Sequence, residues 1–206
     1  GETELRHLPL NHVADASKGA EKPSFTRRLR GVLAPVPREP TIAPQPGLGE
    51  IVLASEASGL NFRDVMYAMR LLPAEALEDG FTGATIGMEA AGTVVAVGDG
   101  VTRFKVGDRA VAFASDAFAS HVVAKEMASI ALPDTLSAPA AATLLTSYVT
   151  AWYGLVDCAR VKSGDLVLVQ AGAGALGLAA IQVARHLGCR VVATAGSGVK
   201  QAVVQA

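Results

Sequence analysis

The chain has few cysteines and no long hydrophobic run, and each absence excludes a class of protein. Only Cys158 and Cys189 occur among its 206 residues, so neither a disulfide framework nor a four-cysteine metal lobe is available. We expect both thiols to be buried and structural. The apolar runs are too short to span a bilayer, and residues 1–6 lack the features of a signal peptide. We therefore expect a cytoplasmic protein without membrane contact.

The sequence also lacks an excess of charge of either sign. The formal net charge is −1, and no basic field is present, which argues against a nucleic-acid partner. Half of the residues are hydrophobic (50%), enough for a sizeable core. Seven of the ten prolines fall within residues 1–46, among lysines and arginines. We interpret this segment as a linker or N-terminal arm with one strand at residues 25–33, or alternatively as a docking arm for a neighbouring domain.

Short β-type runs dominate the next part of the chain. Residues 51–58 predict a strand, and residues 61–71 predict a short helix because Phe62, Val65, Met66 and Met69 recur at helical spacing. Further strands are expected at residues 92–97, 109–113 and 120–123, with glycine turns between them. Several short strands closely spaced by turns indicate a small antiparallel barrel or sandwich over residues 47–134.

An apolar helix leads into the last part. Ser137 is the expected N-cap, and residues 140–156 are apolar on nearly every face. We expect this helix to be buried between two domains, with a break near Ser147.

Residues 166–197 follow the order strand, glycine turn, helix, strand. The turn reads Gly172-Ala-Gly174-Ala175-Leu176-Gly177, which is the dinucleotide-binding pattern in the expected βαβ context. The first glycine allows a tight turn, the second lets backbone approach a pyrophosphate, and the third lets helix pack on strand. The alternative is that the glycines serve helix packing alone. Because the chain has one helix after the second strand, we expect an incomplete Rossmann-type unit over residues 135–206.

Five motifs, taken in order, resemble one family. They are residues 59–66 (GLNFRDVM), 87–92 (GMEAAG), 98–108 (GDGVTRFKVGD), 118–123 (FASHVV) and 140–143 (AAAT). They resemble the medium-chain dehydrogenase/reductase superfamily, and within it the enoyl reductase domains of modular polyketide synthases and animal-type fatty acid synthases. The resemblance implies an α/β plus β fold, with a GroES-like substrate domain followed by a Rossmann-type cofactor domain. It also implies NADPH-dependent reduction of a trans-2-enoyl thioester on an acyl carrier protein, among neighbouring synthase domains, and is compatible with a homodimer.

The residues themselves bear on the metal and the cofactor. Zinc-dependent members of the superfamily carry a cysteine in the segment 61–64 and a histidine at Met88, so the resemblance implies a metal-free site. No acidic residue occurs from Leu166 to Ala206, although an NAD site usually places one there for the ribose 2′-OH. Ser197 and Lys200 stand at about that distance and match the phosphate-binding positions of the family, so NADPH is favoured. Lys200 as an ordinary exposed lysine is the alternative.

Three further positions follow from the resemblance. Asn61 and Thr150 match residues near the nicotinamide and the substrate, although Thr150 could equally bond to its own helix. Leu72 falls where some enoyl reductases place a tyrosine, and a leucine cannot donate a proton. Three substitutions depart from the expected pattern, since Arg70 and Ala175 replace glycines and Gly198-Val199 replaces a more polar pair before Lys200.

Three functions remain open from the sequence. The first is a portion of a carrier-protein-dependent enoyl reductase, and the second is an inactive structural remnant within a megasynthase. The third is a free-standing quinone or small-enone reductase of the same superfamily.

Overall fold

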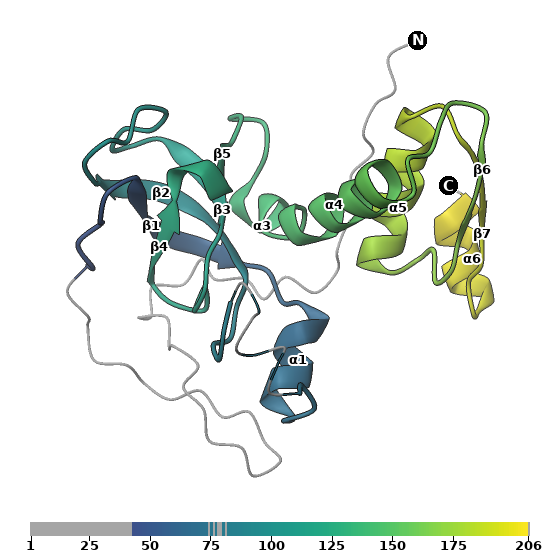
Figure 1. Ribbon diagram of the computed structural model, residues 1–206, viewed down its shortest axis with the longest axis horizontal. Helices are drawn as coiled ribbons and strands as arrows, with labels where there is room; N and C mark the ends of the chain where they lie inside the picture. Colours follow the sequence, from purple (N-terminus) through teal and green to yellow (C-terminus); the bar gives the residue numbers. More distant parts are fainter. Residues whose placement is uncertain (1–42, 74, 76, 78–79, 81, 206) are drawn as a thin grey trace.

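The structure is a computed structural model that describes residues 43–73, 75, 77, 80 and 82–205. The strand expected at residues 25–33, and nearly all of the expected arm, lie outside these residues. Figure 1 shows two units, a β-sheet unit and a smaller α/β unit, with helices α3 and α4 running between them.

The first unit is a five-stranded antiparallel sheet. Its strands pair in the order β4-β1-β2-β3-β5. A core of small and branched side chains, including Ile51, Leu53, Val94 and Val122, fills its interior. This confirms the all-β arrangement, although the sequence did not indicate β5. The strands are β1 (Glu50–Ser58), β2 (Glu89–Val97), β3 (Arg109–Phe113), β4 (His121–Lys125) and β5 (Ser129–Ala131).

Helix α1 (Phe62–Ala68) follows β1 and is shorter than the sequence indicated. It begins with a capping box between Asn61 and Asp64. It ends in a reverse turn in which the Leu71 N–H donates to Met66 O at 2.9 Å. Arg70 lies in that turn at a φ of 59°, a left-handed conformation, which explains why glycine is the expected residue there.

The apolar face of α1 that gave the helical pattern does not face the core. Phe62 is 77% exposed and Met69 is 60% exposed, whereas Tyr67 and the Asp64 carboxylate point inward. Helical spacing therefore located the helix correctly but does not say which side packs.

The expected apolar helix 140–156 is divided into three pieces. These are α3 (Ala138–Ala141), α4 (Leu145–Trp152) and the π-helical η2 (Tyr153–Cys158). Ser137 caps α3 as expected, since its side chain accepts from Ala140 N. The break lies at residues 142–144, not near Ser147, because α4 starts where Glu89 reaches its first turn, as described below.

The expectation that this helix is buried between two domains was wrong for one of its sides. One side of α4 packs on α5 through Ala151, Ala179 and Val183, and the Tyr148 hydroxyl donates to Gln182 Oε1 at 2.6 Å. The other side leaves Trp152 46% exposed. The reason is geometric, because the packing partner in the described part of the chain covers a single face.

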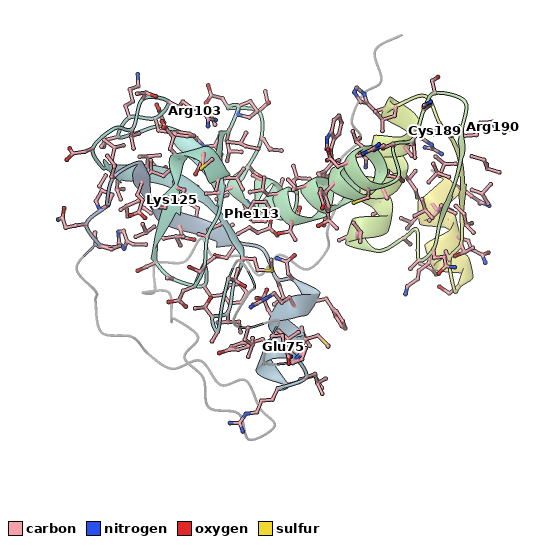
Figure 2. The ribbon with its side chains drawn as sticks, viewed as in Figure 1. Glu75, Arg103, Phe113, Lys125, Cys189 and Arg190 are labelled. Carbon is pink, nitrogen blue, oxygen red and sulfur yellow. The ribbon has the colours of Figure 1, made fainter. Side chains whose placement is uncertain are left out.

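The second unit contains two parallel strands, β6 (Leu166–Val169) and β7 (Arg190–Ala193). Helix α5 (Ala175–His186) connects them, and α6 (Gly198–Gln205) follows β7. The predicted βαβ order is confirmed. Figure 2 places the labelled Cys189 and Arg190 on this unit, well apart from Arg103, Phe113 and Lys125 on the sheet unit.

The two cysteines differ in environment. Cys189 is buried, and its Sγ lies 3.4 Å from Lys162 O. Cys158 is exposed at the end of η2, so the expectation of two buried thiols was wrong for this residue. In the part of the chain that the structure describes, no helix has the length and apolar character needed to cross a membrane.

Candidate nucleotide and substrate site

The glycine turn joins the end of β6 to the start of α5. Ala171 adopts a positive φ of 51°, and the Gly172 N–H donates to Thr194 O at 2.8 Å. A Cβ on Gly172 would lie 2.9 Å from the Ala193 Cβ. A Cβ on Gly177 would lie 2.4 Å from Ala171 O. Both positions therefore require glycine because backbone and small side chains fill the space.

The start of α5 suits an anion. Gly174 is the N-cap, and Ala175, Leu176 and Gly177 form the first turn of the helix. Glycine has no side chain with which to cap the free N–H groups, and the helix dipole adds a partial positive charge there. A Cβ on Gly174 would approach Ala171 O at 3.3 Å and nothing closer, so this side of the turn is open. These features fit the pyrophosphate of a dinucleotide.

Ser197 and Lys200 lie at the same end of the parallel pair as the glycine turn. The Thr194 N–H donates to Val169 O at 3.0 Å, and this bond brings the two strand ends together. Ser197 precedes α6, and Lys200 belongs to its first turn, with the Lys200 N–H 3.4 Å from Ser197 Oγ. Both residues are exposed. A hydroxyl, a cation and a helix start therefore lie beyond the second strand, and the sequence supplies no carboxylate there.

On the sheet unit, Asn61 is held from two directions. Its backbone N–H donates to Asp64 Oδ2 at 2.8 Å, and its side-chain Nδ2 donates to Glu89 Oε1 at 2.9 Å. Asp64 is fully buried, and its Oδ1 accepts from Gly87 N at 2.8 Å. The start of α1 is thus tied to the chain segment that enters β2.

Helix α1 is further attached to the loop before β2. The Arg63 guanidinium donates to the carbonyl oxygens of Thr85 and Gly83, and the Tyr67 hydroxyl donates to Ala84 O at 2.5 Å. These contacts fix the position of Asn61 relative to the sheet.

Thr150 lies on α4, the helix whose first turn contacts Glu89. The Thr146 N–H donates to Glu89 Oε2 at 2.9 Å, and Thr150 lies one helical turn further along the same face of α4. Thr150 is exposed, and Leu72 is half-buried after the end of α1. Burial raises the pKa of Tyr148, the tyrosine within α4.

Sequence reasoning missed Asp64 and Glu89. Both are buried acids that lie in or beside apolar segments of the sequence. An acid in such a position needs hydrogen-bond donors when it is buried, and that position was the signal from which these residues could have been found. No group of three or more His, Cys, Asp or Glu side chains suited to a metal ion is found among the residues described.

The fold combines an antiparallel β-sheet unit with a βαβ unit, and helices join the two. This combination indicates the class of protein to which the chain belongs. The alcohol dehydrogenase GroES-like domain model matches residues 47–154, about half of the chain. The chain belongs to this family, within the medium-chain dehydrogenase/reductase superfamily, and resembles the enoyl reductases of polyketide synthases.

Among curated proteins, the chain is 41% identical over 159 residues to the pikromycin polyketide synthase component PikAII of Streptomyces venezuelae. The match covers 77% of this chain and 4% of that protein. Among solved structures, the CurK enoyl reductase matches with a TM-score of 0.79 and 33% identity, over 90% of this chain and 57% of that one.

Two mycobacterial structures are also similar. A quinone oxidoreductase has a TM-score of 0.69 and 39% identity, over 85% of this chain and 52% of that one. A structure complexed with NADPH has a TM-score of 0.69 and 38% identity, over 80% and 50% of the two chains. The chain therefore spans about half the length of these solved structures.

Proposed function

We propose that the chain is part of an NADPH-dependent enoyl reductase of a polyketide synthase, acting on a trans-2-enoyl thioester carried by an acyl carrier protein. One observation carries the proposal. The glycine turn and the Ser197–Lys200 segment lie at the same end of β6 and β7, where the Gly172 N–H bonds to Thr194 O at 2.8 Å. A dinucleotide could place its pyrophosphate at the first turn of α5 and its 2′-phosphate near Lys200.

The bound cofactor would supply a hydride to the β-carbon of the enoyl thioester. The double-bond electrons then move onto the α-carbon and thioester oxygen, and a proton at the α-carbon completes the saturated product. Asn61 and Thr150 are proposed to orient the reacting groups. Leu72 holds no proton to give, so the proton comes from water or from a residue outside the matched motifs.

The cofactor assignment is tested with Lys200→Ala in a complete reductase domain that contains this sequence. The affinity for NADPH should fall about tenfold or more, the effect of losing a charge-assisted contact, while the affinity for NADH stays unchanged. Lys162→Ala is the matched control, since Lys162 is also exposed but precedes β6 at the opposite end of the strands. Equal loss of both cofactors would contradict the assignment.

A quinone or small-enone reductase is the second candidate, favoured by the 39% identity to a quinone oxidoreductase. The two functions separate in one assay. The complete domain is given NADPH with either a crotonyl thioester on a carrier protein or a free quinone, and nicotinamide absorbance is followed. Turnover with the quinone alone would reject the proposed substrate, and no turnover with either would favour an inactive structural remnant. We expect no measurable turnover from the 206-residue chain by itself.

A further inference from the structure

One buried carboxylate joins three elements of the candidate site. Glu89 is 2% exposed and begins β2. Its Oε1 accepts from Asn61 Nδ2 at 2.9 Å, just before α1, and its Oε2 accepts from Thr146 N at 2.9 Å, in the first turn of α4. Both oxygens of the carboxylate therefore accept from N–H donors, one just before α1 and one in the first turn of α4.

The contact with α4 fixes one of these oxygens. The N-cap of α4 is Leu144, whose side chain cannot accept a hydrogen bond, so Glu89 caps the helix in its place. A carboxylate at a helix N-terminus is also favoured by the helix dipole. Because a backbone N–H cannot turn over, Oε2 has one fixed partner.

The fixed carboxylate decides how the Asn61 amide is oriented. A carboxylate accepts hydrogen bonds and does not donate them, so Asn61 must turn Nδ2 toward Glu89. Oδ1 then lies on the other side of the planar amide, toward the Asp64 N–H of the capping box, which also donates to the Asn61 backbone O at 2.9 Å. Among the residues that the structure describes, Glu89 is the acceptor for Nδ2, so its second proton is available to a ligand.

We propose that Glu89 is a positioning residue that fixes the Asn61 amide so that it offers a hydrogen-bond donor, and not an acceptor, to a bound ligand. A donor suits the oxygen of a thioester carbonyl, which gains negative charge when hydride reaches the β-carbon. That choice of ligand rests on the proposed function, whereas the orientation of the amide does not.

The orientation is tested by NMR on the ¹⁵N-labelled 206-residue chain carrying Glu89→Gln. The new amide keeps its oxygen on the fixed Thr146 N–H and turns its NH₂ toward Asn61, which must then present Oδ1. We expect the Asn61 Nδ2 protons to exchange with water about tenfold faster or more, the factor for losing a charge-assisted hydrogen bond. Their nuclear Overhauser contacts should move to the Asp64 N–H. Asn61→Asp assigns the signals, because Asn11 is the only other asparagine in the sequence.

Asp64→Asn is the matched control. Asp64 is also buried and also accepts from two N–H groups, Asn61 N and Gly87 N, each at 2.8 Å. This variant should lose stability, but the Asn61 Nδ2 protons should keep the exchange rate and the nuclear Overhauser contacts that they have in the wild type. The proposal would be overturned if the exchange rate and contacts of the Asn61 Nδ2 protons were unchanged in Glu89→Gln. It would also be overturned if they changed equally in both variants.

Two further measurements keep the proposal open to refutation. The first measurement is made on the wild-type chain and is informative even if Glu89→Gln does not fold. If the Asn61 Nδ2 protons exchange with water as fast as those of a short asparagine peptide, the proposal is overturned. In the complete reductase domain, Glu89→Gln should lower kcat about tenfold with little change in the KM for NADPH. If the amide is reversed but kcat is unchanged, the donor role is rejected. The NMR test of the amide orientation does not depend on which reaction the protein catalyses.

Discussion

Replacing Gly177 by alanine should destabilise the α/β unit, because α5 passes close to the glycine turn at this point. A Cβ there would lie 2.4 Å from Ala171 O and 2.8 Å from the Gly172 Cα, both backbone atoms. Ordinary contact begins at 3.4 Å, so helix or turn must move by about 1 Å. Overpacking of this kind costs about 1–3 kcal/mol, which for a chain of this size lowers Tm by several degrees.

Gly174→Ala provides the comparison on the same turn. Its Cβ would meet only Ala171 O, at 3.3 Å, and its φ of −82° is open to alanine. We expect a loss below about 1 kcal/mol, the difference between glycine and alanine at an N-cap. The added methyl group would instead stand where a pyrophosphate approaches the backbone, so NADPH affinity in the complete reductase domain should fall about tenfold or more.

Urea unfolding followed by circular dichroism measures the first effect, and quenching of NADPH fluorescence measures the second. The reasoning fails if Gly177→Ala unfolds at the same midpoint as the wild type. It also fails if Gly174→Ala binds NADPH normally, since the turn would then not hold the pyrophosphate.

Three smaller effects follow from local geometry. Arg70→Gly should raise the free energy of unfolding by about 1 kcal/mol by relieving a φ of 59°, whereas Arg70→Ala, which keeps the Cβ, should not; equal urea midpoints for both would contradict this. The hydrogen bond from Lys125 holds the pKa of Glu50 below its usual value. The ionised Glu50 therefore stabilises the folded protein at pH values above the pKa of the unfolded state, and this contribution is lost as the pH falls through the pKa of the folded state. Glu50→Gln should flatten this loss in acid titrations, and a steeper loss would refute the sign. Tyr148→Phe removes the hydrogen bond to Gln182 and should lower the free energy of unfolding by about 1 kcal/mol, measured by thermal unfolding. An unchanged stability would count against this contact.

The sequence alone determined the elements whose causes are local. The order β6, α5, β7 follows from an apolar run, a glycine turn and a helical pattern, and each signal spans a few residues. The strained position of Arg70 was likewise visible as a missing glycine, because a helix that ends in a left-handed residue prefers glycine there. The placement of Ser197 and Lys200 beyond the second strand followed from chain length within the βαβ unit.

Tertiary structure decided what depends on partners far apart in the chain. Glu89 and Thr146 are 57 residues apart, and no local pattern indicates that this acid caps α4 or that the expected helix breaks at residues 142–144. The direction in which α1 packs was likewise undetermined, since its apolar face is exposed while Asp64 is buried. A buried carboxylate is stable only where donors converge on it, and that convergence exists once β2, α1 and α4 are assembled.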